Sequence, residues 1–274
     1  MLTVASVNVN GIRAAWKRGM GEWVAARQPD VLLLQEVRAP HEMVGDFLPA
    51  SDWDLAHHES QVKGRAGVAI ATRLPMRAVR IGLTPLPDAT DGSELPSDTG
   101  RWVEADLDLP DGRVLTVVST YIHSGTLGTP SMAEKYAYLE RVTARLAELR
   151  ADDDGLALLA GDVNIAHRNE DIKNWKGNVK SAGFLPQERA YLDRWFDGQG
   201  WVDLGRRLGG DGPGPFTWWS WRGKAFDNDA GWRIDYQIAS PALAAVAVKA
   251  EVDRAPSYAE RFSDHSPLVV TYEL

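Results

Sequence analysis

The sequence predicts an α/β protein in which two stacked mixed sheets carry helices on their outer faces. Apolar runs of strand length outnumber helical ones, and they are joined both by helices and by hairpin turns. Several of these runs are apolar throughout, as is typical of strands buried on both faces. No linker, low-complexity segment or internal repeat divides the 274 residues, so we expect a single domain over residues 1–274.

The N-terminal half predicts a β-α-β start followed by antiparallel strands. Residues 2–9 form an apolar strand, residues 13–27 a helix, and residues 30–36 a strand of hydrocarbon side chains that ends in Gln35 and Glu36. The Asp111-Gly112 pair predicts a hairpin turn. Further strands are predicted at residues 53–57, 67–72, 102–109 and 114–122. Residues 84–99 are rich in Pro, Asp, Ser and Gly and predict a long exposed loop.

The C-terminal half begins with the clearest helix, over residues 131–150. Ser131 and Glu134 match a capping box. Apolar residues recur every three or four positions and predict a buried stripe at Met132, Tyr136, Leu139, Val142, Leu146 and Leu149. A second helix is predicted at residues 187–196. The remaining strands are predicted at residues 156–160, 216–221, 234–239, 246–252 and 268–272.

Composition and charge limit the classes of function. The chain has no cysteine, so any metal ion must bind to oxygen or imidazole. It has no apolar stretch near the roughly 20 residues that span a bilayer and no signal-like N-terminus, which predicts no membrane contact and a cytoplasmic location. The net charge of −8 argues against a protein that coats nucleic acid. Local basic groups are still present, at Arg13, at Lys63 with Arg65, and in residues 168–180 around Lys176, with solvated surface charge as the alternative.

Four polar strings lie at the ends of predicted strands. They are Gln35-Glu36, Gly161-Asp162-Val163-Asn164, Arg233-Ile234-Asp235 and Ser263-Asp264-His265-Ser266-Pro267. Strand ends that converge in space are where α/β enzymes assemble their sites. Carboxylates, an amide and an imidazole together suit metal-assisted attack on a phosphate.

Each string suggests a role and also has a structural alternative. Asp162 and Asn164 lie two apart in an extended segment and can address one substrate group, although an Asx turn has the same sequence. Glu36 suits Mg²⁺, which prefers hard oxygen ligands, although it could also be an exposed strand-end glutamate. His265 needs a second carboxylate to favour its charged form, and Asp235 is the candidate. The other histidines are expected mostly at the surface.

Tryptophan is abundant, with 11 residues, and three of them lie within four positions. In an extended segment Trp218 faces opposite to Trp219 and Trp221. Core packing accounts for most of these rings. One face, and Trp232 before Arg233, could instead contact a base or a baseless sugar.

Six motifs in order resemble those of the exonuclease III type of AP endonuclease, from Val4 to about Tyr272. The motifs are Asn8-Val9-Asn10-Gly11-Ile12-Arg13-Ala14, Leu34-Gln35-Glu36, Gly161-Asp162-Val163-Asn164-Ile165-Ala166-His167, Phe216-Thr217-Trp218-Trp219, Gly231-Trp232-Arg233-Ile234-Asp235-Tyr236 and Ser263-Asp264-His265-Ser266-Pro267.

The resemblance implies a four-layer α/β/β/α sandwich of two stacked mixed sheets, as in the endonuclease/exonuclease/phosphatase superfamily. It implies a Mg²⁺-dependent DNA repair phosphodiesterase, with Mn²⁺ as an alternative ion. Such an enzyme cuts duplex DNA 5′ to abasic sites and also trims or cleans recessed and blocked 3′ ends. We expect it to act as a monomer.

The resemblance also implies roles for individual residues. Glu36 would be the principal metal ligand, with Asn10 and Asp264 in or beside the metal shell. Asp162, held by Asn8, would orient or deprotonate the attacking water. Asn164 and Tyr121 would contact the phosphate, and Asp235 would pair with His265. Trp218 and Trp232 match positions that line the pocket for a flipped-out abasic residue, and Lys176 and Arg101 are expected to contact DNA.

The chain departs from the family after Tyr121. Ile122-His123-Ser124-Gly125 replaces the usual Pro-Asn-Gly, and His123 is a candidate phosphate donor or general acid there. The Gly100-Arg101 pair lacks the acid that usually precedes it, because Thr99 stands in that place. Two alternatives stay open. One is a metal-dependent enzyme of the same fold that acts on a non-DNA phosphate ester, and the other is a non-catalytic nucleic-acid-binding relative.

Overall fold

The computed structural model describes residues 1–83 and 100–274, and it confirms two stacked six-stranded mixed sheets. The first sheet has the order β11-β12-β1-β2-β4-β3 and the second the order β5-β6-β7-β8-β10-β9. Each sheet has one parallel pair near its centre, β1 with β2 and β7 with β8, and antiparallel neighbours on both sides. The predicted loop at residues 84–99 lies outside the described residues.

The strands of the two sheets have these bounds. The first sheet contains β1 (Leu2–Asn8), β2 (Val31–Gln35), β3 (Asp54–His58), β4 (Val68–Thr72), β11 (Ala247–Val252) and β12 (Leu268–Tyr272). The second contains β5 (Met76–Ile81), β6 (Trp102–Asp108), β7 (Val114–Tyr121), β8 (Leu156–Asp162), β9 (Val202–Asp203) and β10 (Asp235–Ala239).

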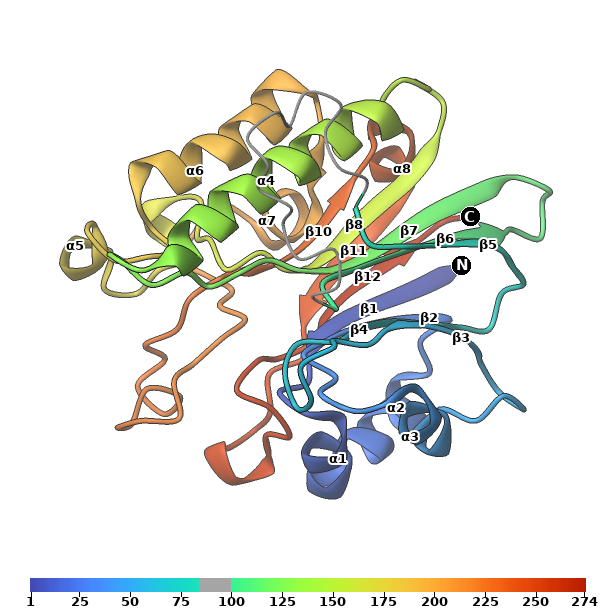
Figure 1. The fold of residues 1–274 in the computed structure, drawn as a ribbon, viewed down its shortest axis with the longest axis horizontal. Coiled ribbons are helices and arrows are strands. Elements are labelled where there is room, and N and C mark those ends of the chain that lie inside the picture. The colour runs from blue at the N-terminus through green and yellow to red at the C-terminus, as the bar shows by residue number, and fades with distance from the viewer. Residues whose placement is uncertain (84–99) are drawn as a thin grey trace.

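Helices cover the outer faces of both sheets (Figure 1). Those with the first sheet are α1 (Ile12–Ala15), α2 (Gly21–Arg27) and α3 (His41–Phe47). The others are α4 (Pro130–Leu149), α5 (Trp175–Asn178), α6 (Pro186–Asp193), α7 (Leu204–Gly209) and α8 (Pro241–Ala245). Among residues 1–83 and 100–274, no helix combines the length and the apolar character needed to cross a membrane.

Three apolar cores separate the four layers. The middle core lies between the sheets and includes Val4, Leu33, Val117 and Leu158. A second core packs the first sheet against α1, α2 and α3, and a third packs the second sheet against α4 and α6. Because β1, β2, β4 and β8 are each buried on both faces, their sequences are almost continuously apolar. This arrangement confirms the α/β/β/α prediction.

Several predicted elements are wrong in detail. Residues 13–27 do not form one helix, because Gly19 takes a φ of 103° and divides the segment around a π-helical stretch at Trp16–Met20. Helix α4 begins at Pro130 with Thr129 as its N-cap residue, so Ser131 lies inside the helix and the capping box is wrong. The hydroxyl of Ser131 instead accepts the backbone N–H of Thr126, at 2.9 Å.

The predicted strand at residues 216–221 is also wrong. Trp218 forms only isolated bridges, with Trp232 and with His265. The apolar character of this segment has a different cause, because Phe216 and Trp219 pack with Phe226 in a separate small core. Trp218 and Trp219 nevertheless face different surroundings, as their adjacent positions predict.

The expectation that most of the other histidines are surface residues is wrong. His58 is buried, with 6% of its surface exposed, and its Nδ1 lies 2.8 Å from the Trp102 carbonyl oxygen. His167 is buried as well and lies 2.7 Å from an Asp193 oxygen. Short elements such as α3, β5, α7 and α8 were not predicted.

Candidate active site

The two central parallel pairs bring four polar residues to one edge of the sandwich. Asn8 and Glu36 lie at the ends of the neighbouring strands β1 and β2. Tyr121 and Asp162 are register partners at the ends of β7 and β8. Asp235 begins β10 directly opposite Asp162. The strand ends therefore converge as the sequence predicts.

Asn8 joins the two sheets at this edge. Its side chain is completely buried, and its amide nitrogen donates to Glu36 Oε1 at 2.8 Å and to Asp162 Oδ2 at 2.9 Å. Both amide hydrogens are used, so one side chain holds two carboxylates that would otherwise repel each other. No apolar residue could replace it in this role.

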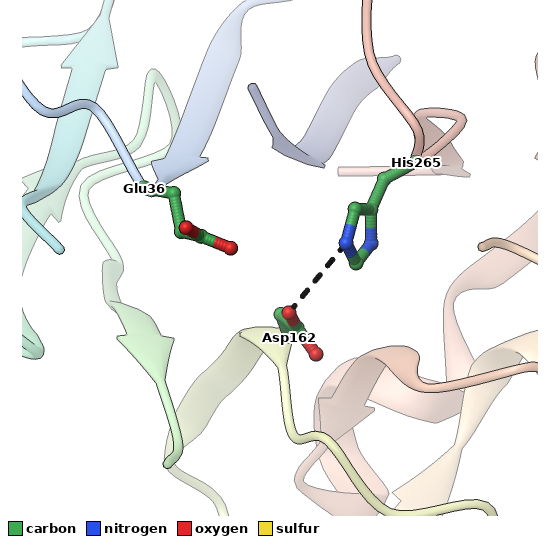
Figure 2. A group of neighbouring side chains, drawn as sticks. All are labelled: Glu36, Asp162 and His265. Atoms are coloured by element: carbon green, nitrogen blue, oxygen red, sulfur yellow. Dashed lines mark ion pairs between the residues drawn. The ribbon is translucent and has the colours of Figure 1, made fainter. Parts of the chain in front are cut away.

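Glu36, Asp162 and His265 form the centre of the site. One potential ligand atom from each lies within 4.8 Å of the other two. Figure 2 shows the three side chains approaching a common space from separate segments, with the ion pair between His265 and Asp162 drawn as a dashed line. That pair spans 3.8 Å from His265 Nε2 to Asp162 Oδ2. These side chains lie at positions 36, 162 and 265, so only the fold brings them together.

Asp235 orients and charges His265. Its Oδ2 lies 2.9 Å from His265 Nδ1, and both side chains are almost fully buried. Burial lowers the pKa of His265, but the carboxylates of Asp235 and Asp162 outweigh it and raise that pKa to about 10. The imidazole is therefore a cation near neutral pH, with Nε2 directed towards the centre of the site.

Asp162 is almost completely buried, with 1% of its surface exposed. Burial raises its pKa to about 8; the charge of His265 opposes that rise, while Asp235 and Glu36 add to it. Its Oδ1 accepts the backbone N–H of Asn164 at 2.9 Å. Asn164 itself has a left-handed φ of 54°, which asparagine tolerates, and donates its side-chain amide to the Ile122 carbonyl at 2.9 Å.

Asp264 forms a second acidic position beside the centre. Its Oδ1 accepts the Asn10 amide at 2.8 Å, and its Oδ2 accepts the Trp218 indole N–H at 3.1 Å. Burial raises the pKa of Asp264, but His265, Asn10 and Trp218 together hold it below its usual value. Asp264 therefore stays ionised and fixes the Trp218 ring.

A cavity of about 480 Å³ opens over these residues. Trp218 and Trp232 line it with their rings nearly perpendicular, at 86° and with 6.2 Å between centroids. Apart from Ile234, the remaining lining residues are polar or small. They are Glu36, Arg38, Tyr121, Ser124, Gly125, Asp162, Asn164, Ser181, Ala182, Gly183, Ile234, Asp264 and His265.

Tyr121 points its phenol towards the carboxylates. Burial raises its pKa, and the charges of Glu36 and Asp162 raise it further, so the hydroxyl stays protonated and can donate. Arg101 lies over the Tyr121 ring at 4.7 Å and donates to the Tyr121 carbonyl at 3.2 Å. Arg101 thus supports Tyr121 from behind.

Three residues expected to contact DNA lie away from the cavity lining. Arg101 is behind Tyr121, Lys176 is an exposed residue of α5 beside the Trp175 ring, and His123 packs edge-on against Tyr138. Burial, together with the charges of Arg101 and Lys135, lowers the pKa of His123 to about 3. His123 is therefore neutral near pH 7, which does not suit a general acid.

The sequence reasoning missed two cations close to the site. Arg38 contacts Glu36 and lines the cavity, and Lys135 lies under the cavity wall with no exposed side-chain surface. A signal for Lys135 was present, because it lies three positions after Met132 and four before Leu139 on the predicted buried stripe of the helix. A lysine on such a stripe indicates a buried charge with a specific partner.

The donor set suits a hard cation. Four carboxylates, those of Glu36, Asp162, Asp235 and Asp264, gather near the His265 and Arg38 cations. Asp235 Oδ1 is buried and has no hydrogen-bond partner among residues 1–83 and 100–274. A positive ion beside Glu36 would reduce the repulsion that raises the pKa of Asp162. Oxygen donors of this kind are those that Mg²⁺ prefers.

Comparison with known proteins agrees with this site. Residues 5–265 match the model of the endonuclease/exonuclease/phosphatase family. The chain belongs to this family. The match covers nearly the whole chain and includes every residue of the Glu36, Asp162 and His265 group.

Relatives of the chain include an exodeoxyribonuclease and endonucleases that act at apurinic or apyrimidinic sites. An exodeoxyribonuclease of Bacillus subtilis is 30% identical over 97% of this chain and 98% of its own length. A DNA-(apurinic or apyrimidinic site) endonuclease of Dictyostelium discoideum is 29% identical over 88% of this chain, which spans 63% of that relative. The structure of an AP endonuclease from Archaeoglobus fulgidus superposes over 100% of both chains, with a TM-score of 0.85 and 27% identity. The resemblance to exonuclease III type AP endonucleases is confirmed.

Proposed function

We propose that this chain is a Mg²⁺-dependent DNA repair phosphodiesterase that cleaves duplex DNA 5′ to abasic sites. We further propose 3′-5′ exonuclease and 3′-end cleaning activities at the same site. The observation that carries the proposal is the convergence of Glu36, Asp162 and His265 within 4.8 Å, beneath a cavity lined by two tryptophans. The names of the relatives, an AP endonuclease and an exodeoxyribonuclease, support the same substrate class.

Glu36 is the principal residue that would hold the divalent ion, with Asp264 and Asn10 in or beside its shell. Mg²⁺ needs only one or two carboxylates because it retains several waters, and Mn²⁺ can use the same oxygen ligands. When bound, the ion neutralises charge on the phosphate and its oxygens. Groups of this chain would carry out the remaining steps, which are orientation of the water, proton transfer and stabilisation of the phosphate charge.

Asp162 is the residue that would orient the attacking water and take its proton. Its raised pKa gives it the basicity that such a proton transfer needs near neutral pH. Asn8 and the Asn164 backbone N–H hold its two oxygens in place. His265, kept charged by Asp235, would donate through Nε2 to a phosphate oxygen as negative charge develops. Tyr121 and Asn164 would contact the same phosphate.

The surroundings of the site favour DNA over a small phosphate ester. A neighbouring cavity of about 340 Å³ shares Arg38 with the first one and is lined by Arg13, Lys63 and Arg65. Four cations around one cavity suit the phosphates that flank a cleavage point, in spite of the net charge of −8. Trp218 and Trp232 offer apolar faces to a residue that has left the base stack, and a missing base makes that extrusion easier.

The direct test compares three substrates in the presence of Mg²⁺ and of a chelator. They are a duplex with one synthetic abasic site, a matched duplex with a recessed 3′ end, and a small phosphodiester. We expect cleavage of both duplexes with Mg²⁺, loss with chelator and restoration by Mn²⁺. If neither duplex is cut while the small ester is hydrolysed, the enzyme acts on another phosphate ester. If nothing is cut, the chain is a non-catalytic relative.

The proposal extends to the location and the oligomeric state of the enzyme. We also propose that the enzyme is cytoplasmic and monomeric, and the monomeric state accords with a catalytic group that comes from one chain. Gel filtration with light scattering would measure the mass in solution, and a dimer would contradict the monomeric state.

A further inference from the structure

A buried ion pair lies directly behind the cavity wall. Lys135 of α4 and Glu188 of α6 have no exposed side-chain surface, and Lys135 Nζ lies 2.5 Å from Glu188 Oε1. Lys135 Nζ also donates to the backbone carbonyls of Asn164, at 2.9 Å, and Ser124, at 3.1 Å. All three donors of the ammonium group are therefore used.

Glu188 extends the same network to another segment of the chain. Its Oε2 accepts the backbone N–H groups of Gly183, at 2.7 Å, and Leu185, at 3.0 Å. One ion pair thus makes four further charge-assisted hydrogen bonds, all of them to backbone groups. Because these bonds go to backbone groups, they fix the path of the chain and do not depend on which side chains stand at those positions.

The segments held in this way are those that line the cavity. Ser124 with Gly125, Asn164, and Ser181 to Gly183 all belong to its wall. Gly183 has a φ of 87°, and a Cβ atom there would lie 3.0 Å from the Asn164 carbonyl oxygen and 3.3 Å from the Trp232 ring. The wall is therefore tightly packed against both a proposed phosphate contact and a pocket tryptophan.

Stability alone is a poor reason for such a pair. Taking both charges out of water is costly, and a protein in which apolar residues of similar volume replace a buried ion pair is often equally or more stable. Burial accordingly lowers the pKa of Lys135, although Glu188 opposes this. What apolar residues cannot supply is the set of directed bonds to Ser124, Asn164, Gly183 and Leu185.

We propose that Lys135 and Glu188 are positioning residues that hold the Asn164 backbone and the 181–183 wall in the geometry required for phosphate cleavage. The inference rests on the proposed function, because it assigns the pair to that reaction. Neither residue touches the substrate. Both act through Asn164 and the wall, whose small displacement would misalign the phosphate and slow the chemical step.

The kinetic consequence separates positioning from folding. Loss of partners that orient active-site groups typically costs about 10- to 100-fold in activity, and we expect kcat to fall by that factor. The KM for abasic duplex should change less than about threefold, because the cations proposed to bind the flanking phosphates line the neighbouring cavity and are not partners of this pair.

The experiment uses the full chain with the double substitution Lys135→Met/Glu188→Gln, which removes both charges together. The matched control is Arg145→Met/Glu104→Gln, an ion pair of 2.6 Å that also involves α4 but lines no part of the cavity. Steady-state cleavage of abasic duplex gives kcat and KM, and thermal unfolding shows that each variant is folded. We expect the control to keep the wild-type kcat. Equal loss in both pairs, or no loss in either, would overturn the proposal.

A second measurement identifies the path of the effect. Asn164→Gly keeps the positive φ and removes the amide, and combining it with Lys135→Met/Glu188→Gln completes a double-mutant cycle. If the pair acts through Asn164, the combined loss of kcat is smaller than the product of the separate losses. A combined loss of kcat equal to the product of the separate losses would contradict this.

Failure of the double variant to fold and failure of the wild-type protein to cleave lead to different conclusions. Should the double variant fail to fold, Glu188→Gln alone keeps the size of the side chain but replaces one of its two acceptor oxygens with an amide donor, so that either the bond to Lys135 or the bonds to Gly183 and Leu185 are lost, and a kcat lowered about 3- to 10-fold is expected. A wild-type kcat in that variant would overturn the inference. Failure of the wild-type protein to cut abasic duplex would instead refute the proposed function.

Discussion

Removal of the Asp235 charge isolates what that residue does for His265. Asp235→Asn keeps an oxygen that can accept the Nδ1–H of His265, now at 2.9 Å from Oδ2, but removes the negative charge. Asp235 is buried, with 1% of its surface exposed, so water cannot replace that charge. The geometry of the pair is conserved while its electrostatics changes.

The size of the effect follows from this hydrogen bond. A hydrogen bond to a charged group contributes about 1.5–3 kcal/mol, which corresponds to about 10- to 150-fold in rate. The Asp235 charge is also one cause of the His265 pKa of about 10. Without it, only Asp162 and Asp264 oppose the effect of burial, so the pKa of His265 falls and the imidazole loses its proton at a lower pH than in the wild type. We expect a loss of kcat that increases from pH 6 to pH 9.

The assay is single-turnover cleavage of abasic duplex over pH 6 to 9. The wild-type enzyme should show no loss from His265 deprotonation across this range, whereas the variant should decline towards high pH. Asp211→Asn, at an exposed position, is the control and should behave as wild type. A kcat for Asp235→Asn within threefold of wild type at every pH would refute the electrostatic role of Asp235.

Three further predictions concern stability and substrate binding. His123 has a pKa of about 3, so between pH 6.5 and 3 the unfolded chain binds a proton that the folded chain does not. The free energy of unfolding therefore falls as the pH falls, by about 1–2 kcal/mol between pH 7 and 5. Urea unfolding of His123→Gln should show a smaller decline over the same range, and an identical decline would contradict this. Trp232→Ala should lower kcat/KM for abasic duplex about 10- to 150-fold, from the about 1.5–3 kcal/mol that burying a large apolar side chain against the baseless sugar contributes, and unchanged kinetics would exclude ring contact. Leu146→Ala should lower the free energy of unfolding by about 2–5 kcal/mol in urea without changing kcat, because Leu146 is fully buried between α4 and the second sheet.

The sequence predicted the layers and the centre of the site because both depend on local patterns. Strands buried on both faces are continuously apolar, so the polar residues that end them, such as Glu36 and Asp162, stand out. The pairing of Asp235 with His265 was predicted from the need of a buried imidazole for a carboxylate, and the structure places them in contact. The catalytic roles of these residues, the single domain and the monomeric state stay predictions.

The remainder depends on tertiary contacts that no local pattern reveals. Gly19 divides a helix that periodicity alone reads as continuous. Trp218 belongs to a segment with the composition of a strand, but its backbone forms hydrogen bonds with Trp232 alone among the described residues. The residues on either side of Trp218 form hydrogen bonds to Asp264 and Ser266, which flank His265. Lys135 pairs with Glu188, which is distant in sequence, and Arg38 pairs with Glu36, two residues before it; in the sequence both positions look like ordinary helix and surface charges.

The most direct test of the central claim is cleavage of abasic duplex by Asp162→Asn in the presence of Mg²⁺. Asparagine keeps the size of Asp162, but its amide cannot take a proton from water, and general-base catalysis typically contributes about 10²- to 10⁴-fold. We predict a loss of turnover of that size, with a melting temperature and an affinity for abasic duplex close to those of the wild type. An Asp162→Asn enzyme that cuts at the wild-type rate would contradict the account of this site.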